Sequence, residues 1–267
     1  MCRNLSKQFG NFVAVSSMNF SVAEGELFGF LGPNGAGKTT TIKMMTGLLA
    51  PTQGSAEIGG FDIQAAPLEA KAAMGYILVN PFLYEKLTGR EYLRFMADLY
   101  RVSLKDRERR IQDLLRLFEL ETKGGEMIQG YSRGMRQKIS LAGALIHSPR
   151  VLFLDEPTVG LDPKGARTMV EVLRELTARG TTVFVSTHIL GIAERVCDRV
   201  AIVNRGSLIA LGTIDEIRQG MHQPPPPSEE EGFSALSAEP NAQKSLEDIF
   251  LELTGDYEQR DLAEFLD

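Results

Sequence analysis

The feature that most constrains the fold is a glycine-rich segment, residues 32–39, which reads G-P-N-G-A-G-K-T. Residues 26–31 before it form a short, mostly apolar run that follows a glycine. Residues 38–48 after it have a composition compatible with a helix. A short apolar run, a glycine-rich turn and a helix together predict the strand, loop and helix of an α/β fold.

The same segment predicts a site for phosphates, because its spacing is G-x-x-x-x-G-K-[ST]. Gly35 and Gly37 let successive backbone N–H groups turn inward toward an anion held at the helix N-terminus. Lys38 adds a positive charge between two phosphates, Thr39 can bind Mg²⁺ through its hydroxyl, and Thr40 can donate to the α-phosphate. The motif alone indicates an NTPase. The loop residues expected to bind the nucleotide are Asn34, Gly35, Ala36, Gly37, Lys38, Thr39 and Thr40.

Two stretches between residues 88 and 120 have the spacing of amphipathic helices. Each is preceded by a hydroxyl residue, Thr88 or Ser103, with an acid three residues later, which is the pattern of a capped helix start. We therefore expect a helical subdomain, at about residues 81–147, inserted into the α/β core. The apolar positions expected to share a face are Tyr92, Phe95, Met96 and Leu99 in the first helix and Ile111, Leu114, Leu115 and Phe118 in the second.

The core resumes with two continuous apolar runs, residues 151–154 and 182–186, which are typical of parallel strands buried on both faces. A helix is expected between them at about residues 163–178. Residues 199–203 and 207–211 then predict a hairpin. Residues 221–244 contain four consecutive prolines and a run of three consecutive glutamates and predict a linker. A docking helix capped by Ser245, with a tail to residue 267, is expected beyond it.

Composition excludes several classes of protein. The net charge of -6 has both signs interspersed, so we expect no nucleic-acid partner. The two cysteines are far apart and lack the C-x-x-C spacing of a zinc or redox site. No apolar stretch approaches the roughly 18 residues that cross a bilayer, so a membrane contact would require a partner.

Three further motifs follow the glycine-rich loop in a fixed order: Y-S-R-G-M at residues 131–135, D-E-P at 155–157 and S-T-H at 186–188. Together they resemble the ABC ATPase family over about residues 4–212. The resemblance implies an α/β fold, with a P-loop NTPase RecA-like core, an antiparallel β-subdomain and the inserted helical subdomain, within residues 1–220. It also implies that two copies close head to tail over two ATP molecules.

Two adjacent acids carry the chemistry that this resemblance implies. Asp155 follows an apolar strand, so its carboxylate emerges at the edge of the sheet where it can hold Mg²⁺ through water. Glu156 is then the candidate general base for the attacking water. His188 matches the histidine that touches the γ-phosphate, although a histidine after a strand can also be an ordinary turn residue.

Residues Ser132, Arg133, Gly134 and Met135 match the signature positions of the family, and the resemblance implies that they bind the ATP held by the opposite subunit. Ser132 also has the chemistry of a helix N-cap. Arg133 and Met135 depart from the common L-S-G-G-Q form, and this variant resembles that of two-component exporters. Asp162 matches the D-loop at the dimer interface, a role compatible with a second one as the N-cap of the helix that begins at Pro163.

Two other matches leave alternatives open. Phe9 stands where an aromatic residue stacks on adenine, or it packs in the core. Val79 stands where the family has glutamine or glutamate, which contacts Mg²⁺ or water; it can do neither, and Asn80 can replace it only if the loop shifts by one residue. The loop at residues 81–84, P-F-L-Y, either receives a partner helix or packs in the core.

The resemblance implies hydrolysis of ATP with water to ADP and phosphate, dependent on Mg²⁺. The implied partners are ATP, a second ATP-binding subunit in a homo- or heterodimer, and an integral membrane permease on whose cytoplasmic face the chain works. Residues 245–250, S-L-E-D-I-F, resemble the tail of exporter-type subunits. The alternatives are a soluble ABC-type mechanical ATPase and a nucleotide-dependent regulator that hydrolyses weakly, which Val79 leaves open.

Overall fold

The computed structural model describes every residue except 80, 160, 162, 221–244 and 255–267. Its centre is a six-stranded sheet in the order β10-β9-β3-β8-β7-β6. Five neighbouring strands are parallel, and β10 pairs antiparallel with β9. This arrangement confirms the expected α/β core and its terminal hairpin. The strands are β3 (Leu27–Leu31), β6 (Met74–Ile77), β7 (Val151–Asp155), β8 (Thr182–Thr187), β9 (Arg199–Asn204) and β10 (Ser207–Gly212).

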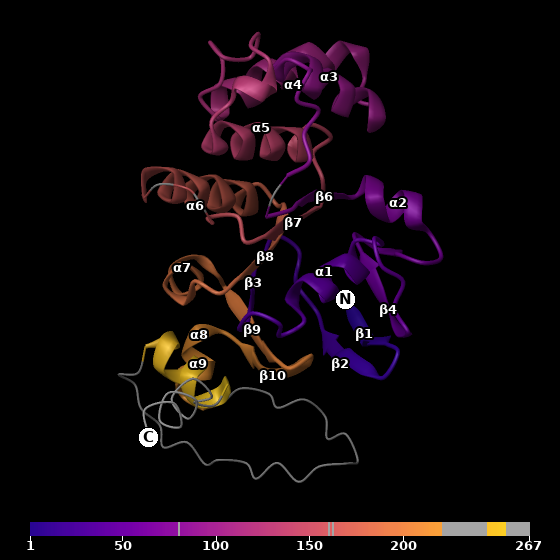
Figure 1. The fold of residues 1–267 in the computed structure, drawn as a ribbon, viewed down its shortest axis with the longest axis vertical. Coiled ribbons are helices and arrows are strands. Elements are labelled where there is room, and N and C mark those ends of the chain that lie inside the picture. Colours follow the sequence, from indigo (N-terminus) through magenta and orange to yellow (C-terminus); the bar gives the residue numbers. More distant parts are fainter. Residues whose placement is uncertain (80, 160, 162, 221–244, 255–267) are drawn as a thin grey trace.

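A second sheet of four strands, in the order β2-β1-β4-β5, is antiparallel throughout. It lies beside α1 at one side of the molecule in Figure 1. Five phenylalanines, buried from both sheets, form an aromatic layer in the core with ring centroids 5.3–6.2 Å apart: Phe20, Phe28, Phe30, Phe153 and Phe184. The strands are β1 (Cys2–Phe9), β2 (Phe12–Phe20), β4 (Gln53–Ile58) and β5 (Phe61–Asp62).

Helix α1 (Lys38–Met45) follows β3 directly, as the glycine-rich segment predicts. It ends earlier than the expected residue 48, because Thr46 is its C-cap and Gly47 takes a left-handed φ of 68°. Such a glycine is a common helix stop. The short helix α2 (Pro67–Ala72) lies between the antiparallel sheet and β6.

The helices α3 (Gly89–Leu99), α4 (Leu104–Leu117) and α5 (Arg133–Leu145), with the 3₁₀ turn η1 (Ile128–Gly130), gather at one end of the molecule (Figure 1). Thr88 forms the expected capping box with Glu91, and Ser103 accepts from the N–H of Asp106. The buried face of α4 is the predicted one, with Ile111 and Leu115 buried.

The predicted face of α3 is partly wrong. Phe95 and Leu99 are exposed by 40% and 62%, whereas Leu93 and Ala97, which were not predicted, are fully buried. The reason is that α3 packs on both α4 and α5. These two neighbours determine which face of α3 is buried, and that face is centred on small and branched residues. The ring of Phe95 instead meets the ring of Tyr84 edge-on at the surface, with centroids 5.0 Å apart.

Helix α6 (Pro163–Ala178) packs on β8 and β3 and lies next to α5 (Figure 1). Three further helices lie near β9 and β10: α7 (Leu190–Val196), α8 (Ile214–Arg218) and α9 (Leu246–Thr254). The expected capped helix forms as α9: the N–H of Asp248 donates to Ser245 Oγ at 3.2 Å, and Leu246, Ile249 and Phe250 are buried against α7 and α8. The expected linker and tail lie outside the described residues. Within the described part of the chain, no helix has the length and apolarity needed to cross a bilayer.

Candidate active site

The glycine-rich loop joins β3 to α1 at the carboxyl edge of the sheet. Gly35 and Gly37 have φ angles of 81° and 98°, which side chains other than glycine rarely adopt. A Cβ at Gly37 would also lie 2.8 Å from the carbonyl oxygen of Ala14. The N–H of Ala36 closes the turn by donating to Pro33 O at 3.2 Å. The left-handed turns therefore explain both glycines of the motif.

Lys38, the first residue of α1, is only 7% exposed. Its Nζ donates back into the loop, to Gly32 O at 2.6 Å and to Pro33 O at 3.1 Å. Burial lowers the pKa of Lys38, and the nearby carboxylates of Glu156 and Asp155 oppose that shift. The ammonium group is thus held inside the loop by carbonyl oxygens, which phosphate oxygens can replace as stronger, charged acceptors.

Asp155 ends β7 and is 2% exposed. Thr39 Oγ1 donates to its Oδ2 at 3.1 Å, and Ser186 Oγ donates to its Oδ1. A hydroxyl and a carboxylate that already touch are oxygen donors of the kind that Mg²⁺ prefers. The residues present therefore fit a magnesium site, with Thr39 and Asp155 as the groups that would hold the ion, directly or through water.

Glu156 lies one residue beyond the strand, with a left-handed φ of 51° that is uncommon for a residue other than glycine. Its N–H donates to Ser186 O at 3.0 Å. Its carboxylate receives His188 Nδ1 at 2.8 Å and Thr187 Oγ1 at 3.2 Å, and lies 3.9 Å from Lys38 Nζ. The structure thus brings together four residues from distant motifs: Lys38 and His188, predicted to contact phosphate, Asp155, predicted to hold Mg²⁺, and Glu156, the predicted general base.

The four signature residues lie elsewhere, at the N-terminus of α5 in the helical layer (Figure 1). Ser132 is the N-cap of this helix, since its Oγ accepts from the N–H of Met135 at 3.3 Å. Ser132 and Arg133 are exposed, and nothing lies within 4 Å of a Cβ placed on Gly134. The start of this helix is therefore open to an anion.

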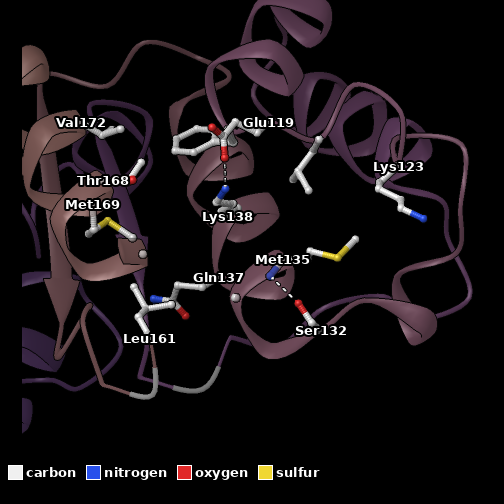
Figure 2. A pocket seen from close by; sticks show the side chains of 14 residues that line it. Glu119, Lys123, Ser132, Met135, Gln137, Lys138, Leu161, Thr168, Met169 and Val172 are labelled. Atoms are coloured by element: carbon white, nitrogen blue, oxygen red, sulfur yellow. Dashed lines mark hydrogen bonds and ion pairs between the residues drawn. The ribbon is translucent and has the colours of Figure 1, made fainter. Parts of the chain in front are cut away.

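A cavity of about 290 Å³ lies between α5 and α6, and Figure 2 shows Ser132, Met135 and Leu161 among the residues that line it. Gln137 also lines it and is 7% exposed. Among the described residues no hydrogen bond involves the Gln137 amide. Sequence reasoning missed this buried amide, because its burial arises only when α6 covers α5.

The other predicted site residues are Phe9, Val79, Asn80 and Asp162. Phe9 is 49% exposed at the end of β1, with Lys7 Nζ 5.2 Å from its ring centroid, so it does not pack in the core. Stacking on adenine stays a prediction. Val79 is half-buried, and Asn80 and Asp162 lie outside the described residues.

The P-F-L-Y segment was expected either to receive a partner helix or to pack in the core, and its residues differ in exposure. Phe82 and Tyr84 are exposed by 92% and 57%, whereas Leu83 is partly buried against the core. Glu85 forms an ion pair with Arg136 of α5, which ties this loop to the signature helix. The segment thus combines an exposed aromatic pair with one core residue.

Three polar groups of the site had no predicted role: Ser186 and Thr187, which were named only as part of a motif, and the phenol of Tyr76. The hydroxyl of Tyr76 is buried without a hydrogen-bond partner among the described residues, and burial, aided by the Asp155 charge, raises its pKa to about 12. Ser186 and Thr187 immediately precede His188. Recognising them required the register of β7 against β8, which pairs Asp155 with Ser186.

Comparison with known proteins agrees with this geometry. The family model for ABC transporter domains matches residues 15–159. The chain is 39% identical, over 236 residues, to the probable multidrug ABC transporter ATP-binding protein YbhF of Escherichia coli (strain K12). That match covers 88% of this chain but only 41% of YbhF.

Two solved structures share the fold. An ATP-binding subunit of an ABC transporter superposes with a TM-score of 0.84 at 34% identity, covering 95% of this chain and 98% of the other. The cassette MJ0796, bound to ADP and phosphate after hydrolysis, superposes with a TM-score of 0.72 at 25% identity, covering 80% and 97%. The chain therefore belongs to the ABC transporter family, and its domain is an ABC ATPase.

Proposed function

We propose that this chain is the ATP-hydrolysing subunit of a membrane exporter. The observation that carries the proposal is the cluster of Lys38, Thr39, Asp155 and Glu156 at the ends of β3 and β7. Phosphoryl transfer to water needs charge at the phosphates, a held metal and a positioned base, and this cluster supplies a residue for each. The similarity to YbhF, a probable multidrug ABC transporter ATP-binding protein, supports export.

The residues act as follows. Phosphates of incoming ATP displace the loop carbonyls from Lys38, whose ammonium group then lies between the β- and γ-phosphates. Thr39 and Asp155 would hold the Mg²⁺ that accompanies ATP, and the ion would supply positive charge to neutralise the phosphates. His188 turns from Glu156 toward the γ-phosphate. Glu156 is then free to take a proton from the attacking water.

The exposed N-terminus of α5 supports a dimer. Ser132 caps the helix by accepting from the N–H of Met135, and Ser132 and Arg133 are exposed, so an anion can approach the helix N-terminus, where negative charge is favoured. The γ-phosphate that this N-terminus binds is the one carried by a second ATP-binding subunit, so two subunits close over two ATP molecules. The permease couples to this closure on the cytoplasmic face of the membrane, and the exposed Phe82 and Tyr84 offer it an apolar contact.

The test is turnover by wild type and by Glu156→Gln. Wild type should release phosphate from ATP only with Mg²⁺, and the variant should lose about 100-fold or more, because general-base catalysis contributes about 10²–10⁴-fold. The variant should still bind ATP and should run as a dimer in size exclusion with Mg-ATP. Glu175→Gln, which removes an exposed ion pair with Arg179 on α6, is the control and should match wild type.

Two results would count against the proposal. Turnover by Glu156→Gln within twofold of wild type would remove Glu156 from the role of base. The permease role is tested by co-expression with polytopic membrane proteins encoded by neighbouring reading frames. If the rate of ATP hydrolysis in vesicles is the same with and without such a protein, the transport role is contradicted, while the ATPase activity stands.

A further inference from the structure

The end of β8 places three donors opposite the two acids of β7. The strands are parallel neighbours, and their register pairs Asp155 with Ser186. Ser186, Thr187 and His188 each direct a side-chain donor at one of these carboxylates. The histidine has a place in the proposed function, but the two hydroxyls have none so far.

Ser186 is fully buried, and its hydroxyl donates to Asp155 Oδ1. The other oxygen, Oδ2, receives the hydroxyl of Thr39 at 3.1 Å. A carboxylate fixed at one oxygen by a buried donor cannot rotate, so its second oxygen stays directed at Thr39. Ser186 therefore fixes the orientation in which Asp155 can hold Mg²⁺.

Thr187 is 2% exposed, and its hydroxyl makes two contacts. It accepts from the N–H of Ile189 at 3.0 Å, and its own proton is thereby left for Glu156 Oε2, at 3.2 Å. The donor to the other oxygen of Glu156 is His188, and Lys38 lies 3.9 Å from that same oxygen. Both of those residues turn to the nucleotide in the proposed function, whereas Thr187 is held by the backbone of its own strand end.

We infer that Ser186 and Thr187 are positioning residues that orient the two acids separately, Ser186 the metal-holding carboxylate of Asp155 and Thr187 the general base Glu156. This inference rests on the proposed function and deepens it. The two hydroxyls follow one another in the sequence, yet they serve different steps. Loss of one should impair metal binding, and loss of the other should impair turnover.

The experiment separates the two roles in the full chain with paired substitutions. Ser186→Ala should weaken Mn²⁺ binding in the presence of ADP by about tenfold, the usual lower effect of losing a group that orients a metal ligand. Free Mn²⁺ is measured by electron paramagnetic resonance. At saturating metal its kcat should stay within about threefold of wild type, because Glu156 keeps its own donor.

Thr187→Val should show the opposite pattern. Its kcat should fall about tenfold, because a base that is free to turn spends less time in line with the water. Its KM for ATP and its Mn²⁺ affinity should stay those of wild type. Ser186→Thr and Thr187→Ser restore the hydroxyls and should rescue the respective defects.

The matched control is Thr182→Val, which removes a buried hydroxyl from the opposite end of β8, where it accepts from the N–H of Gly25. It should change neither metal binding nor kcat. Should Ser186→Ala fail to fold in thermal unfolding, Ser186→Cys keeps the volume with a weak donor and should show the same metal defect.

The outcomes distinguish this inference from the function on which it rests. Wild type without Mg²⁺-dependent hydrolysis would overturn the proposed function. The positioning roles alone would be overturned if the wild type hydrolyses ATP but Ser186→Ala has unchanged Mn²⁺ affinity and Thr187→Val has unchanged kcat. Equal losses of metal affinity and kcat in both variants, or no rescue by the restored hydroxyls, would also overturn them by showing a general structural effect.

Discussion

The two halves of the proposed catalytic machinery are built differently within one chain. Around the phosphate loop, Lys38 and Asp155 are 7% and 2% exposed. Lys38 is hydrogen-bonded to carbonyl oxygens of its own loop, and Asp155 accepts from Thr39 of α1. At the start of α5, Ser132 and Arg133 are exposed, and the hydrogen bond of Ser132 is a local helix cap. The first half is preassembled by its own fold, whereas the second has its donors directed to solvent.

The comparison teaches which residues should act within their own subunit and which across the dimer. Buried, mutually bonded groups are positioned before ATP arrives and should govern binding and chemistry. Exposed groups at a helix N-terminus gain a ligand only when a second molecule brings it. Substitutions in the two regions should therefore fail at different steps.

Ser132→Arg should have the largest effect and provides the sharpest contrast. The added side chain blocks the anion position at the helix start, so hydrolysis should fall about 100-fold, comparable to losing an electrostatic contact to the transition state. ATP affinity of the monomer, measured by calorimetry, should be unchanged. Ala178→Arg, at the exposed end of α6, is the control for an added arginine.

A mixture refines this test. In dimers of Ser132→Arg with Glu156→Gln, one composite site should fail while the other still closes. Loss of ATP binding by the Ser132→Arg monomer would instead place Ser132 in the site of its own subunit, and the comparison between the two regions would be broken.

Lys38→Ala should act at the earlier step. Hydrogen bonds to charged groups contribute about 1.5–3 kcal/mol, so ATP binding should weaken about 10- to 100-fold. The measurement is calorimetric titration with ATP. Lys43→Ala, on the last turn of the same helix, is the control and should bind as wild type. Unchanged affinity of Lys38→Ala would contradict the assignment of the phosphate loop.

Val79→Gln probes the boundary between the two regions, since Val79 follows β6 and precedes the helical layer. In the wild type, Thr39 and Asp155 can still hold Mg²⁺ although Val79 lacks the polar side chain found in the family. The absence of that one contact should therefore lower the hydrolysis rate only about tenfold, or 1.4 kcal/mol. Phosphate release by the isolated variant should rise accordingly. A change seen only with permease present would assign the residue to coupling instead.

Asn80→Ala completes that measurement. A large loss of rate in this variant alone would show that Asn80 has taken over the role of the missing side chain. If neither variant responds, with or without permease, the loop does not communicate with the site, and the weakly hydrolysing regulator gains support.

His147 should give the smallest effect, on stability. Its Nε2–H donates to Met74 O of β6 at 3.0 Å, and its ring stacks on Tyr100 beyond α3, so it joins the sheet to the helical layer. Burial lowers the pKa of His147, and the nearby Arg110 adds to that shift. The unfolded chain then binds a proton more readily, so stability is complete above about pH 6.5 and falls as the pH drops below it.

The measurement is the free energy of unfolding in urea at pH 7.5 and pH 5.5. The drop between these values should be smaller in His147→Gln than in wild type, because the amide does not titrate. An equal drop in both proteins would show that other groups carry the pH dependence.

Local patterns of the sequence were enough to predict much of the fold. The glycines of the loop, the capping box at Thr88, the cap at Ser103 and the buried strands β7 and β8 all depend on interactions within a few residues or on uniform burial. The nucleotide loop and the acid pair could be predicted for the same reason. Their chemistry is carried by short motifs beside a single strand.

Packing decided what those patterns left open. The apolar periodicity of α3 is compatible with more than one buried face. Only the contacts with α4 and α5 show that Leu93 and Ala97 are buried while Phe95 is exposed. The sequence around Phe9 is compatible with a core position and with a binding position. The ring is exposed because Phe9 lies at the end of β1, which only the structure shows. Such choices depend on neighbours that are distant in sequence.

The sequence by itself therefore determined the class of protein, the order of its motifs and the residue types at each. The tertiary structure alone decided which groups meet. Ser186 reaches Asp155 across 31 residues because β7 and β8 pair in parallel, and Thr187 reaches Glu156 through the same register. Strand pairing is a long-range choice that no local pattern encodes, which is the physical reason why these contacts were not predicted.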